Sequence, residues 1–106
     1  MGYAGYVSFL TEMKQIIRDG AVEFATDEYV ALDDSKFDIK FTTFLTRLQK
    51  RCKDYSEGWF FGPSRFVDQY AASLRQGMEY PRTQRFKRLL DLTDEAMRKA
   101  STPNWM

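Results

Sequence analysis

Apolar residues recur at three- and four-residue steps through most of the chain, which is the spacing of one face of an α-helix. The pattern predicts helices over residues 3–19, 36–55 and 64–77, and a further helix that Pro81 opens and Pro103 stops. The apolar faces of these helices comprise Tyr3, Tyr6, Val7, Leu10, Met13 and Ile17; Phe37, Phe41, Phe44, Leu45, Leu48, Cys52 and Tyr55; Phe66, Val67, Tyr70, Leu74 and Met78; and Phe86, Leu89, Leu90, Thr93, Ala96, Met97 and Ala100.

Glycines and capping residues set the expected helix boundaries. Gly20 and Gly77 are placed to end the first and third helices, as glycine commonly does. Asp34 or Ser35 is expected to cap the second helix, and Ser64 the third, because short polar side chains accept hydrogen bonds from the first free backbone N–H groups.

Residues 21–34 carry two overlapping patterns. Val22, Phe24 and Thr26 alternate as in a strand, and residues 29–32 could pair with them as a hairpin. The same stretch also fits a short helix, and a lone hairpin is marginal in water. Helical or irregular structure is therefore favoured. The fold class that follows is all-α: a single small domain over 1–106 of four or five helices, with a possible short hairpin or irregular segment at 21–34.

Composition narrows the chemistry. The chain has one cysteine and no histidine, which excludes an internal disulfide and removes the commonest general base and metal ligand. Cys52 falls on an apolar face and is expected to be a small buried side chain. No carboxylates stand in a recognisable catalytic arrangement, so neither an active site nor a cofactor or metal is expected. No apolar run approaches the roughly 20 residues that span a bilayer, so any membrane contact is expected to be peripheral or through a partner.

Charge is unevenly distributed although the net charge is +1. Residues 1–46 hold four Lys/Arg against eight Asp/Glu, and residues 47–106 hold twelve against seven. One interpretation is that the two halves attract each other within one fold. The other is a basic face for an acidic partner, which includes nucleic acid.

The segment 56–63 interrupts the helical pattern with Gly58, Gly62 and Pro63. Trp59, Phe60 and Phe61 follow one another within it, and three consecutive rings cannot share one face of a helix. Either the loop buries them or some are exposed as anchors for a partner, a common use of loop aromatics.

Arginines stand at three-residue intervals in the last helix. Arg82 and Arg85 fall in its first turns, where positive charge opposes the helix dipole. They are therefore expected to bind carboxylates, in a partner or in the acidic half of this chain. The internal candidates are Asp27, Glu28, Asp33 and Asp34, and the later charges are spaced for the intrahelical pairs Arg88–Asp91, Asp94–Arg98 and Glu95–Lys99.

The run Arg82-Thr83-Gln84-Arg85-Phe86-Lys87-Arg88-Leu89-Leu90-Asp91-Leu92-Thr93 resembles a segment of a known family. This is the small matrix-side subunit of mitochondrial ubiquinol–cytochrome c reductase (respiratory complex III), related to the animal ubiquinol-binding-protein subunit. The family carries an Arg-x-x-Arg-x-x-Arg helix followed by Asp-Leu-Ser or similar, a Leu-Pro turn and often a Trp. Pro103 and Trp105 are similar to that ending. The resemblance covers about residues 74–105, and Asp94-Glu95 replaces the family's usual Lys-His pair.

The resemblance implies a non-catalytic accessory subunit, peripheral on the matrix side of the mitochondrial inner membrane. It would brace cytochrome b, with cytochrome b and the core subunits as protein partners and without a cofactor. The partner-binding residues predicted on this basis and from the loop aromatics are Arg82, Arg85, Arg88, Asp91, Trp59, Phe60 and Phe61. The alternative function is a small helical protein that binds nucleic acid, or a complex containing it, through the basic C-terminal half.

Overall fold

A computed structural model describes residues 2–58 and 64–101, and every regular element in these ranges is a helix. The α-helices are α1 (Gly2–Phe24), α2 (Asp27–Val30), α3 (Asp34–Glu57), α4 (Ser64–Arg75) and α5 (Arg85–Ser101). Two short 3₁₀ helices, η1 (Gln76–Glu79) and η2 (Arg82–Gln84), connect α4 to α5. The all-α class predicted from the periodicity is confirmed.

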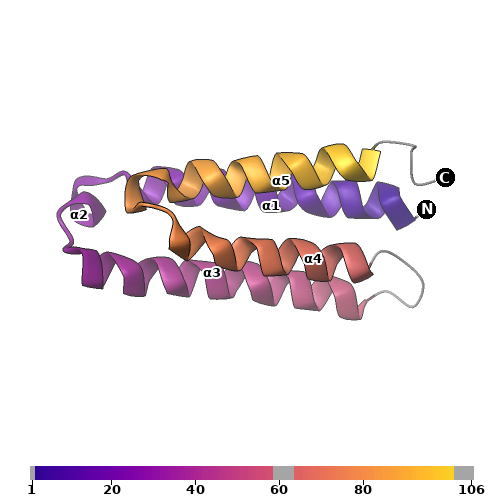
Figure 1. Cartoon of the computed structure of the whole chain (residues 1–106), viewed down its shortest axis with the longest axis horizontal. Coiled ribbons are helices and arrows are strands. Elements are labelled where there is room, and N and C mark those ends of the chain that lie inside the picture. The colour runs from indigo at the N-terminus through magenta and orange to yellow at the C-terminus, as the bar shows by residue number, and fades with distance from the viewer. Residues whose placement is uncertain (1, 59–63, 102–106) are drawn as a thin grey trace.

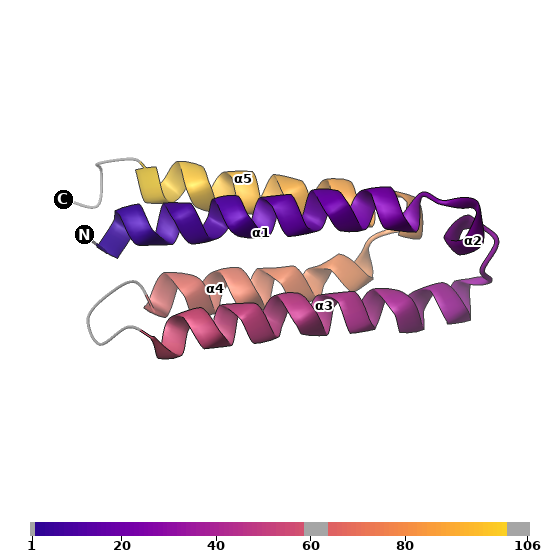
Figure 2. The same ribbon diagram turned by 180° about the vertical axis from the view of Figure 1, so that it is seen from behind.

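The four long helices form an elongated antiparallel bundle with extents of 48 × 24 × 21 Å (Figure 1). Helix α1 lies beside α5 and α3 lies beside α4, and both views show these two pairs facing each other (Figure 2). The short helix α2 sits at the end of the bundle where α1 passes into α3. We call this the α2 end.

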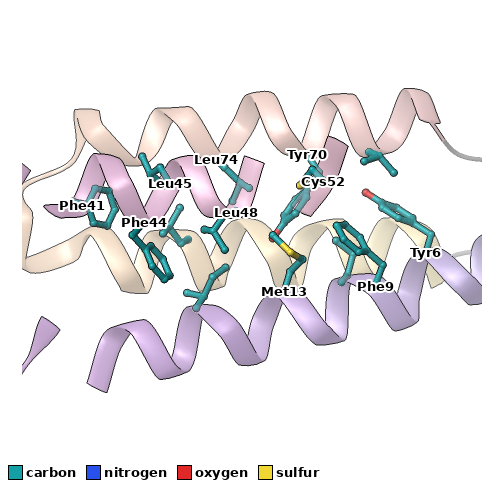
Figure 3. Packing of buried hydrophobic residues seen from close by; sticks show 14 of the residues in the cluster. Tyr6, Phe9, Met13, Phe41, Phe44, Leu45, Leu48, Cys52, Tyr70 and Leu74 are labelled. Carbon is teal, nitrogen blue, oxygen red and sulfur yellow. The ribbon is translucent and has the colours of Figure 1, made fainter. Parts of the chain in front are cut away.

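The predicted apolar faces supply most of the core. Phe41, Leu10, Met13, Ile17, Leu48, Leu74, Leu89, Val67 and Cys52 are almost completely buried. Figure 3 shows Met13 of α1, Leu48 and Cys52 of α3 and Leu74 of α4 among the side chains that meet between the helices. Cys52 is 1% exposed, so the prediction of a buried thiol is confirmed.

Aromatic rings fill the space between α1 and α3. Phe9 stacks on Tyr55 with ring centroids 4.3 Å apart. At the α2 end, Phe24 meets Phe37 edge-on at 5.4 Å and lies 5.0 Å from Phe86. Edge-to-face and offset ring pairs are favourable beyond their buried area. Among the described residues, ring pairs such as Phe9–Tyr55 and Phe24–Phe37 join the two helix pairs.

The suggestion of a short hairpin at residues 21–34 was wrong. Residues 21–24 continue α1, and residues 27–30 form α2. The reason is the packing of Phe24 and Tyr29, whose rings lie 4.6 Å apart and cover the end of the core. A strand would send alternate side chains to opposite faces, whereas the helical path brings both rings to the same side.

Gly20 does not end the first helix, contrary to the prediction. A Cβ atom at this position would lie 2.6 Å from the Phe44 ring and 2.9 Å from the Phe86 ring. The glycine therefore lets α1 approach the aromatic rings of α3 and α5, and its conformation is ordinary, since no described glycine has a positive φ. A close approach of this kind leaves the same sequence signal as a helix terminator.

Gly77 also does not end a helix by adopting a left-handed conformation. The chain passes from α4 into η1, where Gly77 is buried. A Cβ there would lie 3.2 Å from a Leu89 methyl group and 3.6 Å from the Phe41 ring. The connection therefore packs directly on the core.

The predicted cap of α3 and the predicted start of the last helix differ from the structure. Asp33, rather than Asp34 or Ser35, caps α3, since its carboxylate accepts a hydrogen bond from the Lys36 N–H at 2.8 Å. Ser64 is the first residue of α4, and its capping role stays a prediction, because its side chain lies outside the described part of the chain. Pro81 precedes η2, and the α-helix itself begins at Arg85.

Replacing Gly20 by alanine is expected to destabilise the fold by about 1–3 kcal/mol, the usual cost of overpacking. The added methyl group must displace two rings, which outweighs the ~1 kcal/mol that alanine gains in helix propensity. Urea unfolding measures the difference. Gly58→Ala is the matched control, because the nearest atom to its Cβ is 3.5 Å away. A Gly20→Ala protein as stable as the wild type would contradict the close approach.

Candidate functional site

Arg82, the first residue of η2, bonds to α2 and to the connection between α2 and α3. Its guanidinium donates hydrogen bonds to the carbonyl oxygens of Leu32 (2.8 Å), Tyr29 (3.2 Å) and Val30 (3.2 Å). It also pairs with the Asp34 carboxylate at 3.1 Å. The guanidinium carbon lies 4.1 Å from the centroid of the Phe37 ring. The Tyr29 carbonyl also accepts from the Leu32 N–H at 3.1 Å, so Arg82 adds to the backbone bonding at the end of this short helix.

Arg85 is buried, with 7% of its surface exposed. It pairs with the Asp38 carboxylate at 2.6 Å and donates to the carbonyl oxygens of Tyr80 (3.0 Å) and Met78 (3.3 Å). Its guanidinium carbon lies 5.1 Å from the Phe41 ring centroid. The fork of guanidinium donors suits several acceptors at once, so one side chain holds the η1–η2 connection to the start of α3.

The two arginines form a ladder with two aspartates. Arg82 and Arg85 are one turn apart, as are Asp34 and Asp38 on α3, and each arginine takes one aspartate. Of the sequence candidates, Asp34 was proposed as an internal partner, whereas Asp38 was missed. The signal that could have found it is the matching one-turn spacing of the two acids and the two arginines.

Basic residues of the C-terminal half form ion pairs with acidic residues of the N-terminal half. Three ion pairs join a cation of residues 47–106 to an acid of residues 1–46: Arg51–Glu12, Arg82–Asp34 and Arg85–Asp38. The interpretation that the two halves attract each other is therefore confirmed. The placement of Arg82 and Arg85 against the helix dipole is accounted for by bonds within the chain.

Arg88 and Asp91 do remain on the surface of α5. Arg88 is exposed and lies over the Tyr80 ring, 5.0 Å from its centroid. Asp91 pairs with Lys87 at 3.6 Å rather than with Arg88.

The remaining charges of α5 make one predicted pair and two others. Glu95 pairs with Lys99 at 3.7 Å, as predicted. Asp94 instead reaches across to Lys14 of α1 at 2.6 Å, and Arg98 lies 3.7 Å from Glu95.

Several predicted positions fall outside the described residues. Trp59, Phe60 and Phe61, predicted as partner anchors, belong to this group, as do Pro103 and Trp105 of the family-like ending. Their predicted roles stay predictions.

A group of buried hydroxyls and one thiol lies in the other half of the core, which sequence reasoning treated as plainly apolar. The Thr93 hydroxyl donates to the Leu89 carbonyl at 2.8 Å, so the Tyr70 hydroxyl must donate to Thr93, 2.7 Å away. Figure 3 shows Tyr70 and Cys52 among the core side chains. Burial raises the pKa of the Tyr70 hydroxyl above its ordinary value, although the bond to Thr93 lowers it in part. Burial likewise raises the pKa of Cys52 to about 12.

These groups are protonated at neutral pH and act as hydrogen-bonded or packed neutral groups. Burial also raises the pKa of Tyr6, whose hydroxyl donates to the Phe66 carbonyl at 3.2 Å. A thiol whose pKa is raised in this way is a poor nucleophile. Within residues 2–58 and 64–101, no group of three or more Cys, Asp or Glu side chains could hold a metal ion. None of the described helices combines the length and apolar character needed to cross a membrane.

Comparison with known proteins returned no matching family model, and neither a curated protein nor a solved structure with significant similarity was found.

Arg85→Met is expected to lower the free energy of unfolding by about 2–3 kcal/mol, because Asp38 and two backbone carbonyls lose their donor. This expected loss of stability is smaller than the loss from breaking a fully buried ion pair, because the Asp38 side chain is 44% exposed. Urea titration measures the change. Lys87→Met, which breaks an exposed pair on the same helix, should cost no more than about 0.5 kcal/mol. Equal effects of the two substitutions would show that Arg85 carries no special structural role.

Alkaline pH is expected to destabilise the fold. Cysteine and tyrosine ordinarily ionise at 9.0 and 10.0. The folded chain keeps its protons at Cys52, Tyr6 and Tyr70 at those pH values, so raising the pH favours unfolding. Tyr70→Phe removes one of these protons and should make the decline shallower by up to about 1.4 kcal/mol per pH unit above pH 10. Urea unfolding of both proteins across this range is the measurement, and identical slopes would contradict the assignment.

Proposed function

We propose that this chain is a non-catalytic α-helical subunit of the ubiquinol–cytochrome c reductase complex that braces cytochrome b on the matrix side of the mitochondrial inner membrane. The observation that carries the proposal is the resemblance of Arg82–Thr93 to the arginine helix of that family. The structure agrees with this resemblance to the extent that the segment is helical: η2 and α5 follow each other without a gap, and Arg82 is the first residue of η2.

Because Arg82 and Arg85 are bonded within the chain, the proposal needs other residues of the motif to contact a neighbouring subunit. Arg82 and Arg85 make intramolecular bonds, so their contribution to the assembly is indirect: they stabilise the α2 end. Arg88 and Asp91 are both exposed, and their three-residue spacing puts them on one side of α5. They are the members of the motif that remain available to a neighbouring subunit.

The alternative function, binding of nucleic acid through the basic C-terminal half, receives less support. Three cations of that half are bonded to acids of the N-terminal half. Affinity for nucleic acid depends on cations that neutralise phosphates, and these three are already engaged.

Native electrophoresis of digitonin-solubilised mitochondrial membranes tests the proposal. The tagged chain is expected to migrate with the haem absorbance of cytochrome b. The charge-swapped variant Arg88→Glu/Asp91→Lys should weaken this association, because it keeps the net charge of the helix but reverses the two exposed positions. Lys99→Glu on the same helix is the control and should associate normally. A chain that migrates as a haem-free monomer in wild-type membranes would overturn the proposal.

A further inference from the structure

Exposed large apolar side chains gather at one end of the bundle. Val22, Val30 and Ile39 are 72%, 61% and 64% exposed, and they are the large apolar residues left open to solvent among the described residues. All three lie within 18 positions of one another, on the last turns of α1, on α2 and on the first turns of α3. Single exposed apolar residues are ordinary, but an exposed apolar residue that also lines an apolar groove marks a candidate interaction surface, and of the three this holds for Val30.

A groove opens next to Val30. Its volume is about 520 Å³, and its apolar lining consists of Ala21, Phe24, Ala25, Val30, Phe37 and Phe86. Arg82, Thr83 and Asp34 stand among the polar lining residues. The bonds from Arg82 to the Tyr29, Val30 and Leu32 carbonyls hold this wall in place without a partner. The groove is therefore formed before binding, which lowers the entropic cost of docking.

The segment that forms α2 and its two connections carries an excess of acids, although Lys36 and Lys40 follow on the first turns of α3. Residues 19–34 contain six acidic residues and no lysine or arginine. Arg82 neutralises one of them, Asp34. Asp27 and Glu28 on α2 are exposed and make no ion pair with any described residue. A partner that covers this end must supply positive charge, because burying unpaired carboxylates against a neutral or acidic surface is costly.

We propose that the α2 end is a docking surface for a basic amphipathic segment of another protein. The segment inserts a large apolar side chain into the groove beside Val30 and Phe24, and its lysines or arginines face Asp27 and Glu28. The inference rests on the proposed function as an assembly subunit, since it names the surface that a neighbouring subunit uses. It adds a contact at the α2 end to the one proposed for Arg88 and Asp91.

Binding of model peptides to the purified chain tests this surface. The probes are a short amphipathic helical peptide of leucine and lysine and its counterpart of leucine and glutamate. The lysine peptide is expected to bind, and its affinity should fall when NaCl rises from about 0.05 M to about 0.5 M. The glutamate peptide should not bind. Amide shifts in an ¹⁵N-labelled chain should change at residues 21–39 and 82–86.

Variants separate the apolar and the charged parts of the contact. Val30→Ser should weaken lysine-peptide binding about tenfold, as expected for loss of one apolar anchor. Val30→Leu, which keeps the apolar side chain, should retain binding. Asp27→Lys/Glu28→Lys should abolish it, whereas the same charge change at the opposite end, Glu57→Lys/Asp68→Lys, should not.

The inference is overturned if both peptides bind equally, if the shift changes fall at the opposite end of the bundle, or if the Val30 and Asp27/Glu28 variants bind as the wild type does. These assays need no respiratory complex. Failure of peptide binding with normal migration on the native gel would therefore reject the docking surface and leave the subunit assignment standing. Peptide binding by a chain that migrates as a free monomer would reject the assignment to complex III alone.

Discussion

The bonds that Arg82 and Arg85 make across the α2 end are the interaction on which the rest of the structure depends. They connect the η1–η2 segment, just before α5, to α2 and the first turns of α3. Without them, the carbonyl oxygens at the end of α2 and in the η1 connection would lack these donors. Because a guanidinium bonds to several acceptors at fixed angles, two side chains hold three segments of the chain in register.

Two glycines allow close packing in the same part of the bundle as these arginine bonds. Gly20 lets α1 come against Phe44 and Phe86, while Gly77 lets η1 come against Leu89 and Phe41. Both glycines have ordinary backbone conformations, so their value lies in the missing side chain. Phe41, against which Gly77 packs, is also a ring over which Arg85 lies, so packing and polar contacts meet at this side chain.

The sequence pattern was sufficient to predict four of the helices, because three- and four-residue spacing reports directly on one buried face. It could not distinguish Gly20 as a close contact from Gly20 as a helix end, since both uses need a residue without a side chain. The arginine positions were recognised as unfavourable for an isolated helix. Their partners could not be fixed, because Asp38 is 47 residues from Arg85 and meets it only after folding.

The α2 end has an inner and an outer side: bonds from Arg82 hold it from within, and its acidic, partly apolar surface faces outward. The most direct test of the inner role is amide hydrogen exchange in Arg82→Lys, because lysine cannot bond to three carbonyls and Asp34 at once. Exchange should accelerate at Val30, Ala31 and Leu32 while the amides in the middle of α5 keep their protection. Unchanged exchange at these α2 amides would contradict the claim that Arg82 holds this end together.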